Sequence, residues 1–244
     1  MWSPTAVFMK ERCCAEMSYI GQNLRAVQET VQSTENACGR TGQTTVIAAV
    51  KYASDDELRE LLSLGIADVG ENRVQQFLAH EPLYGEYPVR VHFIGTLQKN
   101  KVKYLVGKVH AIHSVDSAEL AEEIEKQARK RGVTVPVFVE VNSGRDEAKS
   151  GVVPEEALSL CRLVSGFPSL SLQGLMTMAP RSDSEAEYRT YFAETKKLAG
   201  EIERELGLTA PLKLSMGMSE SFPAAILEGA DMVRVGRRLF AKPE

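Results

Sequence analysis

"TTVIAAVKYASDDELRELLSLG", residues 44–65, joins an apolar run, a lysine and a helical pattern. The run at 46–50 has no in/out alternation, which is typical of a parallel strand covered on both faces. Ser54 and the glutamate three residues later form a capping box, and Gly65 ends the helical pattern. The stretch therefore predicts a strand–turn–helix unit with Lys51 at the carboxyl end of the strand.

The same unit recurs along the chain, because eight apolar runs alternate with helical patterns. The runs lie at residues 46–50, 66–70, 89–95, 109–115, 135–141, 170–178, 212–216 and 231–236. Eight strands alternating with helices in 244 residues favour an α/β fold, a single (β/α)₈ TIM-type barrel. An open, doubly wound parallel sheet is the alternative.

Several helices have recognisable ends. Asp116 is expected to cap one helix, which Gly132 ends. Pro154 suits the first position of another helix, and Gly207 closes a long apolar stripe further on. These signals support the alternation of strands and helices.

The last apolar run ends too close to residue 244 for a full eighth helix to follow. The segment 18–38 predicts a helix before the first strand, with four apolar residues on one face: Ile20, Leu24, Val27 and Val31. We expect this N-terminal helix to fill the vacant outer position between the last and first strands. Residues 17–244 are predicted to form one domain, and residues 1–16 a disordered extension.

The composition is that of an ordinary soluble protein, with 43% hydrophobic and 25% charged residues. A net charge of −4 does not indicate a nucleic-acid-binding protein, and no apolar run is long enough to cross a membrane. Four cysteines without a Cys-x-x-Cys pair suggest reduced thiols and a cytoplasmic location. The four histidines are not expected to gather, since His110 and His113 have odd spacing, and no metal site is predicted.

Lys51 is a candidate active-site residue, because it follows the first predicted strand and the active residues of parallel barrels lie at the carboxyl ends of strands. A lysine partly shielded there by apolar neighbours is a good nucleophile toward an aldehyde. The alternative is a lysine that ends a strand and extends its amine into solvent.

The last two strands run into loops with the residue types that bind phosphate through backbone N–H groups, at 215–219 and 235–238. Arg234 lies inside an apolar run, where an unpaired charge is costly. Either a carboxylate pairs with this guanidinium or a ligand such as a ring nitrogen accepts from it. A lysine, a phosphate cradle and an arginine at one barrel mouth match pyridoxal 5′-phosphate (PLP).

These motifs occur together in a recognisable order. They are "AAVKYAS", "DVGENRVQQF", "HFIGTLQKNK", "VFVEVNSGRDEAKSG", "LQGLMTM", "LSMGMSESFPAAI" and "MVRVGRRLF". With them the chain resembles the YggS/PROSC family of pyridoxal phosphate homeostasis proteins, single-domain relatives of the alanine racemase N-terminal barrel.

The resemblance implies that Lys51 carries PLP as a Schiff base and that Asn72 lies near the ring hydroxyl of the cofactor. It implies that Arg234 faces the pyridine nitrogen, and that His92 is either a residue behind the cofactor or an ordinary core histidine. The residues implied to hold the phosphate are Ser215, Met216, Gly236 and Arg237.

The resemblance also implies a role in intracellular PLP homeostasis, as a protein that buffers or delivers the reactive aldehyde without robust catalysis. A weak, broad PLP-dependent amino-acid racemase is the alternative, and a barrel enzyme for a phosphorylated metabolite is a third. PLP-dependent apo-enzymes are the expected partners, and a monomer is the expected state. Lys149 is a candidate for transient acceptance of the aldehyde.

Overall fold

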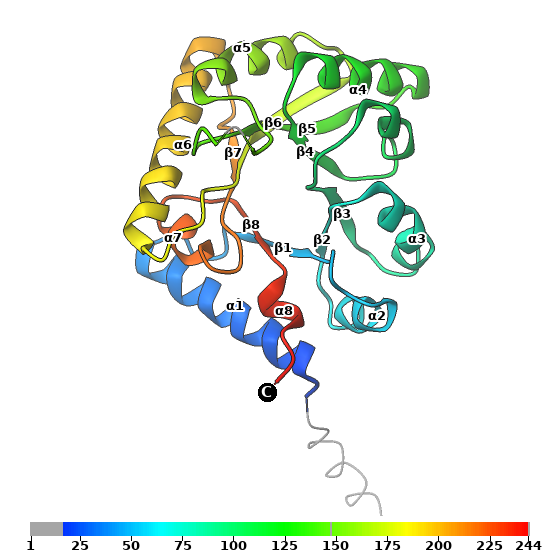
Figure 1. Ribbon diagram of the computed structural model, residues 1–244, viewed down its shortest axis with the longest axis vertical. Coiled ribbons are helices and arrows are strands. Elements are labelled where there is room, and N and C mark those ends of the chain that lie inside the picture. The colour runs from blue at the N-terminus through cyan, green and yellow to red at the C-terminus, as the bar shows by residue number, and fades with distance from the viewer. Residues whose placement is uncertain (1–16, 147, 244) are drawn as a thin grey trace, which may run out of the picture.

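Eight parallel strands close into a barrel with helices around it in the computed structural model, which describes residues 17–146 and 148–243 (Figure 1). The strands pair in chain order, and the last strand pairs with the first. This closure confirms the (β/α)₈ barrel and excludes the open doubly wound sheet. The prediction for residues 1–16 lies outside the described residues.

The strands and helices alternate through the described chain. The strands are β1 (Thr45–Ala49), β2 (Asp68–Glu71), β3 (Arg90–Phe93), β4 (Ala111–Val115), β5 (Val135–Val141), β6 (Leu170–Thr177), β7 (Lys213–Ser215) and β8 (Met232–Val235). The α-helices are α1 (Tyr19–Cys38), α2 (Asp55–Ser63), α3 (Val74–Tyr84), α4 (Ala118–Arg131), α5 (Pro154–Ser165), α6 (Glu185–Leu206), α7 (Phe222–Leu227) and α8 (Arg237–Phe240). A 3₁₀ segment, η2 (Lys99–Tyr104), takes the place of a helix between β3 and β4.

Local sequence signals explain most of the helix ends. The capping box at Ser54 is present in full, and both Gly132 and Gly207 close their helices in the left-handed conformation. The predicted cap at Asp116 is wrong by one residue. Ser117 is the N-cap of α4, and its hydroxyl accepts from the backbone N–H of Leu120 at 3.4 Å.

Helix α1 fills the outer position that the short α8 leaves open, as expected. It packs against α7 and α8, and in Figure 1 it lies beside β8 and β1. The Asn23 amide donates to the carbonyls of Leu239 at 3.1 Å and Ala241 at 2.9 Å, which ties the end of the chain to this helix. Its predicted apolar face is buried throughout. An N-terminal helix therefore completes the outer shell.

The hydrophobic core lies mainly between the strands and the surrounding helices. A small separate apolar cluster is formed by Ala111, Phe138 and Met176, with Met178 and Met232 packed against it. Buried polar side chains accompany this small cluster: His113 stacks on the ring of Phe138 at a centroid distance of 4.2 Å. None of the helices in the described chain is both long and apolar enough for a membrane span.

Leu24→Ala tests the structural role of α1. Leu24 is 5% exposed, so truncation leaves a cavity between α1 and the barrel, and we expect a loss of about 2 to 5 kcal/mol in unfolding free energy. Urea unfolding followed by circular dichroism measures it. Gln28→Ala, at an exposed position of the same helix, is the matched control. An equal, small effect of both substitutions would contradict the packing of α1 as part of the fold.

Candidate functional site

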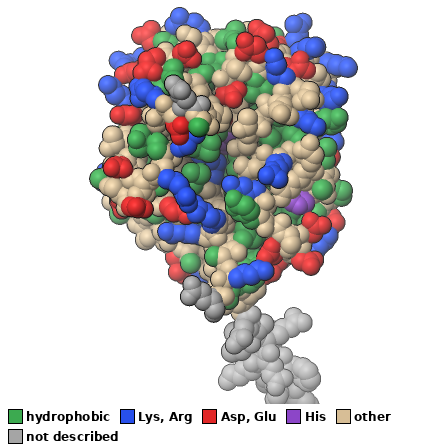
Figure 2. Space-filling view, in the orientation of Figure 1, with side chains coloured by type: hydrophobic (Ala, Val, Ile, Leu, Met, Phe, Trp, Pro, Cys, Tyr) green, Lys and Arg blue, Asp and Glu red, His purple; other side chains and the backbone are tan. Residues whose placement is uncertain are grey.

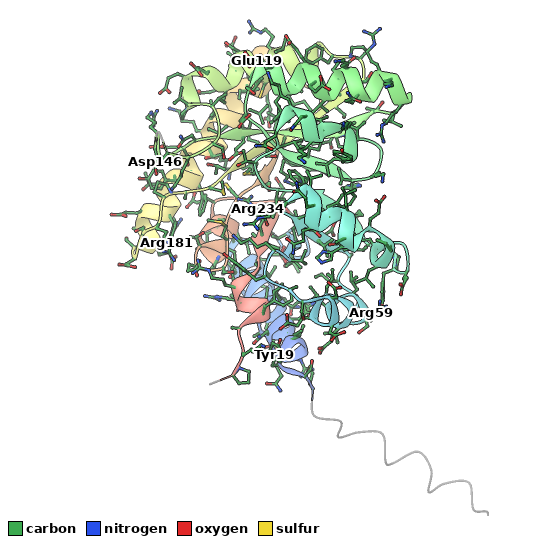
Figure 3. The ribbon with its side chains drawn as sticks, turned by 45° about the vertical axis from the view of Figure 1, so that its right-hand side comes forward. Tyr19, Arg59, Glu119, Asp146, Arg181 and Arg234 are labelled. Atoms are coloured by element: carbon green, nitrogen blue, oxygen red, sulfur yellow. The ribbon has the colours of Figure 1, made fainter. Side chains whose placement is uncertain are left out.

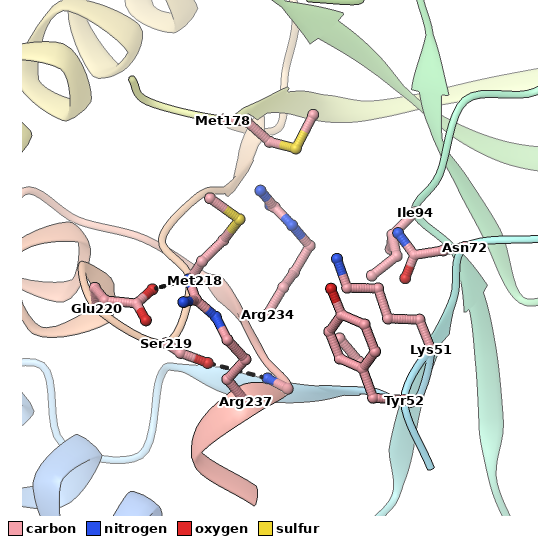
Figure 4. Close-up of a pocket in the computed structure, with 12 residues that line it drawn as sticks. Lys51, Tyr52, Asn72, Ile94, Met178, Met218, Ser219, Glu220, Arg234 and Arg237 are labelled. Atoms are coloured by element: carbon pink, nitrogen blue, oxygen red, sulfur yellow. Dashed lines mark hydrogen bonds and ion pairs between the residues drawn. The ribbon is translucent and has the colours of Figure 1, made fainter. Parts of the chain in front are cut away.

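A cavity of about 110 Å³ opens at the carboxyl ends of the strands (Figure 4). Loops that follow β1, β2, β3, β6, β7 and β8 all contribute to its wall. The residues that line it are Ala49, Lys51, Tyr52, Asn72, Ile94, Met178, Met218, Ser219, Glu220, Arg234, Gly236 and Arg237. Figure 2 shows Lys and Arg side chains gathered beside the hollowed centre of this face of the molecule.

Lys51 lies in the turn just after β1 and extends its amine over the cavity, next to the hydroxyl of Tyr52 (Figure 4). Its Nζ lies 4.9 Å from the centroid of the Tyr52 ring. Both side chains are exposed, with Tyr52 at 63%. The predicted position at the end of the strand is confirmed, but the predicted shielding by apolar neighbours is wrong. The buried run ends at Val50, and the chain turns outward at Lys51 and Tyr52.

Arg234 comes from the middle of β8 and is only 5% exposed. Its NH1 donates to the carbonyl and the hydroxyl of Ser215 at 2.6 and 2.8 Å, and its NH2 donates to the Thr177 carbonyl at 2.8 Å. Within residues 17–146 and 148–243, no carboxylate lies within ion-pair distance of it. Of the two alternatives, the structural ion pair is therefore absent from the described chain, and oxygens on β6 and β7 accept from the guanidinium instead.

The guanidinium of Arg234 remains a cation at neutral pH. Burial lowers its pKa to about 10, and the nearby charge of Glu140 opposes that shift. A charged guanidinium can donate hydrogen bonds but cannot accept them. Figure 3 shows Arg234 within the barrel, whereas Arg59 and Glu119 belong to the outer helices. The cavity is therefore bounded on its inner side by an obligatory donor.

Asn72 follows β2 and lines the cavity beside Ile94 (Figure 4). Its Oδ1 is buried and has no hydrogen-bond partner among the described residues. The backbone of Asn72 is held tightly, since a Cβ at Gly95 would lie only 2.2 Å from the Asn72 carbonyl oxygen. An unpaired buried amide oxygen is costly, so a ligand group that donates a hydrogen bond is favoured here.

The loop after β7 meets the start of α8 at the rim of the cavity. The Ser219 hydroxyl accepts from the backbone N–H of Gly236 at 3.3 Å, and the Arg237 side chain donates to Glu220 at 2.8 Å (Figure 4). Gly236 allows close packing, since a Cβ there would lie 2.8 Å from the Ala49 carbonyl oxygen. Two of the four predicted phosphate residues, Gly236 and Arg237, thus line the cavity.

The other two predicted phosphate residues, Ser215 and Met216, do not line it. Both are fully buried, and the Met216 N–H donates to the Met232 carbonyl at 3.0 Å. Ser219 takes their place at the cavity wall and is 4% exposed. Ser215 ends β7, and Met216 and Ser219 lie in the loop that follows it, so the sequence located this strand-to-loop junction but not the side chain that lines the cavity.

Lys149 lies in the loop between β5 and α5 and is not part of the cavity wall. Its amine is 3.7 Å from the carboxylate of Asp146. Lys51 is therefore the lysine that the fold brings to the cavity within the described residues.

Three of the four histidines gather, contrary to expectation. The ring of His92 lies 5.1 Å from that of His110 and 5.0 Å from that of His113. His110 precedes β4, so strand alternation does not separate it from His113, and His92 comes from the neighbouring strand β3. Asp68 of β2 accepts from His92 Nε2 at 2.9 Å. In the described part of the chain, no cluster of His, Cys, Asp and Glu could hold a metal ion.

Comparison with known proteins places the chain in a family. The family model described as "Alanine racemase, N-terminal domain" matches residues 22–242. A pyridoxal phosphate homeostasis protein of Aquifex aeolicus is 40% identical over 225 residues, covering 91% of this chain and 97% of that protein. The chain belongs to the pyridoxal phosphate homeostasis protein family. A family member from Schizosaccharomyces pombe is 33% identical over 228 residues, covering 92% of this chain and 93% of that protein.

Solved structures agree with this family assignment. PipY of Synechococcus elongatus, solved with PLP bound, has a TM-score of 0.80 and 29% identity, covering 91% of this chain and all of that chain. Alanine racemase of Clostridium difficile has a TM-score of 0.69 at 19% identity, and the match covers only 57% of its chain. The latter likeness shows the shared barrel fold alone.

The Asp68 carboxyl generates a prediction for acid stability. Burial raises its pKa, but hydrogen bonds from His92 and Arg90 outweigh burial and lower the pKa to about 2. Because the folded pKa lies below the unfolded value of about 3.9, the ionised group stabilises the fold above that pH. This stabilisation is lost as pH falls toward 2.

Asp68→Asn is therefore expected to destabilise the family member most above pH 5. The pH-dependent part is about 2 kcal/mol and shrinks as the pH is lowered through 4 and 3. Urea unfolding at each pH measures the difference, with Asp56→Asn at an exposed site on α2 as the matched control. A difference between the wild type and Asp68→Asn that stays constant from pH 6 to pH 3 would contradict the pairing.

Proposed function

We propose that this protein binds pyridoxal 5′-phosphate reversibly on Lys51 and buffers or delivers the aldehyde. The observation that carries the proposal is one cavity that presents an exposed amine and a buried, charged guanidinium. Relatives at 40% and 33% identity, matched over nearly their whole length, are named pyridoxal phosphate homeostasis proteins. PipY, matched over its whole chain, has been solved with PLP bound.

The polar groups of the cavity fit this cofactor. The unpaired Asn72 amide suits the ring hydroxyl, and the donors of Arg234 suit a ring nitrogen. At the rim, the Ser219 hydroxyl and the start of α8 at Gly236 suit the phosphate. We include Arg237 with the rim, although its side chain pairs with Glu220. Ser215 and Met216 are better assigned to support behind the cavity wall.

Lys51 supplies the covalent attachment in this proposal. Its amine nitrogen bonds to the aldehyde carbon, the aldehyde oxygen leaves as water, and added water reverses the step. The exposure of Lys51 suits entry and release, because water and an acceptor enzyme can reach the linkage without opening the barrel. Reversible attachment at an open site is what a buffer or a carrier requires.

Arg234 disfavours strong catalysis in the same proposal. Bound PLP supplies an aldehyde and an electron-withdrawing ring. Because Arg234 can only donate, a ring nitrogen facing it accepts a hydrogen bond and has no proton of its own. An unprotonated ring withdraws electrons less strongly, so turnover of amino acids at this site is expected to be slow.

The alternative is a racemase, which needs two bases on opposite faces of the substrate. The Tyr52 hydroxyl is a candidate second base in the cavity wall, but Tyr52 lies beside Lys51 rather than opposite it (Figure 4). This arrangement favours the carrier. The third hypothesis, a barrel enzyme for a phosphorylated metabolite, is less favoured because it assigns no role to the amine of Lys51.

The proposal also covers the recipients of PLP, the oligomeric state and the location of the protein. PLP-dependent apo-enzymes are the proposed recipients of the aldehyde, and residues 17–244 are proposed to act as one PLP-binding domain, as a monomer in the cytoplasm. Light scattering of the purified protein tests the monomer, and recovery of activity in a PLP-free apo-enzyme mixed with the loaded protein tests delivery.

Lys51→Ala is expected to abolish covalent retention of PLP. Borohydride makes the link to the lysine amine irreversible, and mass spectrometry of the peptides locates it. The unchanged protein and Lys149→Ala should both carry the label on Lys51, since Lys149 is not part of the cavity wall. Label on Lys149, or an unchanged amount of label in Lys51→Ala, would contradict the assignment.

Exchange of the substrate α-hydrogen separates the carrier from the racemase. Incubation of the PLP-loaded protein with alanine in deuterated water, followed by proton NMR, is expected to show no exchange above that of free PLP. Lys51→Ala is the control for exchange that depends on the site. Exchange at enzyme-like rates that disappears in Lys51→Ala would overturn the carrier and support the racemase.

A further inference from the structure

Five buried side chains form a continuous chain of hydrogen bonds behind the cavity. Asp68 Oδ1 and His92 Nε2 are 2.9 Å apart, and His92 Nδ1 and His113 Nε2 are 2.9 Å apart. His113 Nδ1 lies 3.0 Å from the Ser215 hydroxyl, which lies 2.8 Å from Arg234 NH1. All five residues are 5% exposed or less. We call this set the interior chain.

The two ends of the interior chain determine its direction. Arg234 can only donate, and the ionised carboxylate of Asp68 can only accept. The Ser215 hydroxyl accepts from Arg234, so its own proton is available for the one remaining partner, His113 Nδ1. His113 then carries its proton on Nε2 and donates to His92 Nδ1, and His92 carries its proton on Nε2 and donates to Asp68. One assignment satisfies every member.

Both imidazoles are neutral in this assignment. Burial lowers the pKa of His113 well below its usual value, and the positive charge of Arg234 acts in the same direction. A second proton on His92 would point an N–H at the N–H of His113. This clash would be avoided only if the His113 proton moved from Nε2 to Nδ1. The Ser215 hydroxyl would then have no acceptor for its proton. The neutral, one-directional arrangement is therefore the state in which Ser215, His113 and His92 each have a partner for their proton.

The interior chain decides which donors of Arg234 remain for a ligand. The two protons of NH1 go to the carbonyl and the hydroxyl of Ser215, and one proton of NH2 goes to Thr177. The second NH2 proton and the Nε proton remain, and Arg234 lines the cavity. If the Ser215 hydroxyl turned its proton toward Arg234 instead, NH1 would lose one of its two acceptors, and only the carbonyls of Ser215 and Thr177 would hold the guanidinium.

We propose that His92 and His113 are positioning residues for the cofactor: through Ser215 they hold Arg234 in the orientation that donates to the ring nitrogen. This inference rests on the proposed function, because it assigns PLP as the acceptor. Neither histidine lines the cavity, so their effect reaches the ligand only through Ser215 and Arg234. Asp68 anchors the far end of the same chain, near the amino end of the barrel.

The first test uses the unchanged protein without PLP. NMR of the histidine ring nitrogens, with ¹⁵N labelling, is expected to show His92 and His113 as neutral rings protonated on Nε2 at neutral pH. A proton on Nδ1 of either ring, or on both nitrogens of one ring, would overturn the direction of the interior chain. This result does not depend on PLP binding.

The second test compares substitutions at His113. His113→Leu removes the acceptor for Ser215, and we expect PLP affinity to fall about tenfold, the effect of losing one hydrogen bond to a charged group. The absorbance maximum of bound PLP is also expected to shift, since the ring nitrogen loses its ordered donor. His113→Asn keeps an oxygen near the position of Nδ1 and is expected to restore both properties in part.

His110→Leu is the matched control, because His110 contacts the His92 ring but has no hydrogen bond to the interior chain among the described residues. It should bind PLP with unchanged affinity and absorbance. A folded His113→Leu protein with the affinity and spectrum of the wild type would overturn the positioning role. Failure of the unchanged protein to take up PLP would overturn the proposed function and, with it, the cofactor role of the interior chain, whatever the tautomers are.

Discussion

The arrangement of the site depends on one constraint, the burial of the Arg234 guanidinium without a carboxylate beside it in the described chain. A buried charge is tolerated only if its donors are paired. Here the partners are two carbonyls and a hydroxyl from strands on the same side of the barrel, at Ser215 and Thr177. Three of the five guanidinium protons are thereby used, and two remain on a side chain that lines the cavity. An acceptor group on a ligand would complete the set, in line with the proposed role of Arg234.

Closure of the barrel brings the other half of the site to this guanidinium. Strands β8 and β1 pair in register, with Ile47 opposite Arg234 and Ala48 opposite Val235. The lysine that follows β1 and the glycine that follows β8 must therefore emerge side by side. No side chain fits at Gly236, because the Ala49 carbonyl occupies that space. An open sheet with the same strands would separate the amine from the guanidinium by the width of the sheet.

Sequence patterns predicted the parts of this structure that local chemistry determines. Apolar runs located all eight strands, and the Ser54 capping box and the left-handed glycines located helix ends. Contacts between strands were not predictable in the same way. The odd spacing of His110 and His113 predicted that these two side chains lie apart. Their shared neighbour, His92, comes from the adjacent strand β3, and its ring is hydrogen-bonded to His113 inside the barrel. Likewise, a buried arginine in a sequence does not say whether oxygens of the backbone or a carboxylate will accept from it.

The contrast between the two ends of the site suits storage of a reactive aldehyde better than its conversion. The inner end is rigid, since Arg234 is held by oxygens on two strands and is backed by polar groups that have one consistent direction. The outer end is open, since Lys51 and Tyr52 are exposed and come from a turn rather than from a strand. Rigid recognition of the ring favours uptake from a dilute pool, whereas an open covalent end lets water and acceptor enzymes reach the linkage. Catalysis would require the reverse, with the reacting end enclosed and flanked by two opposed bases.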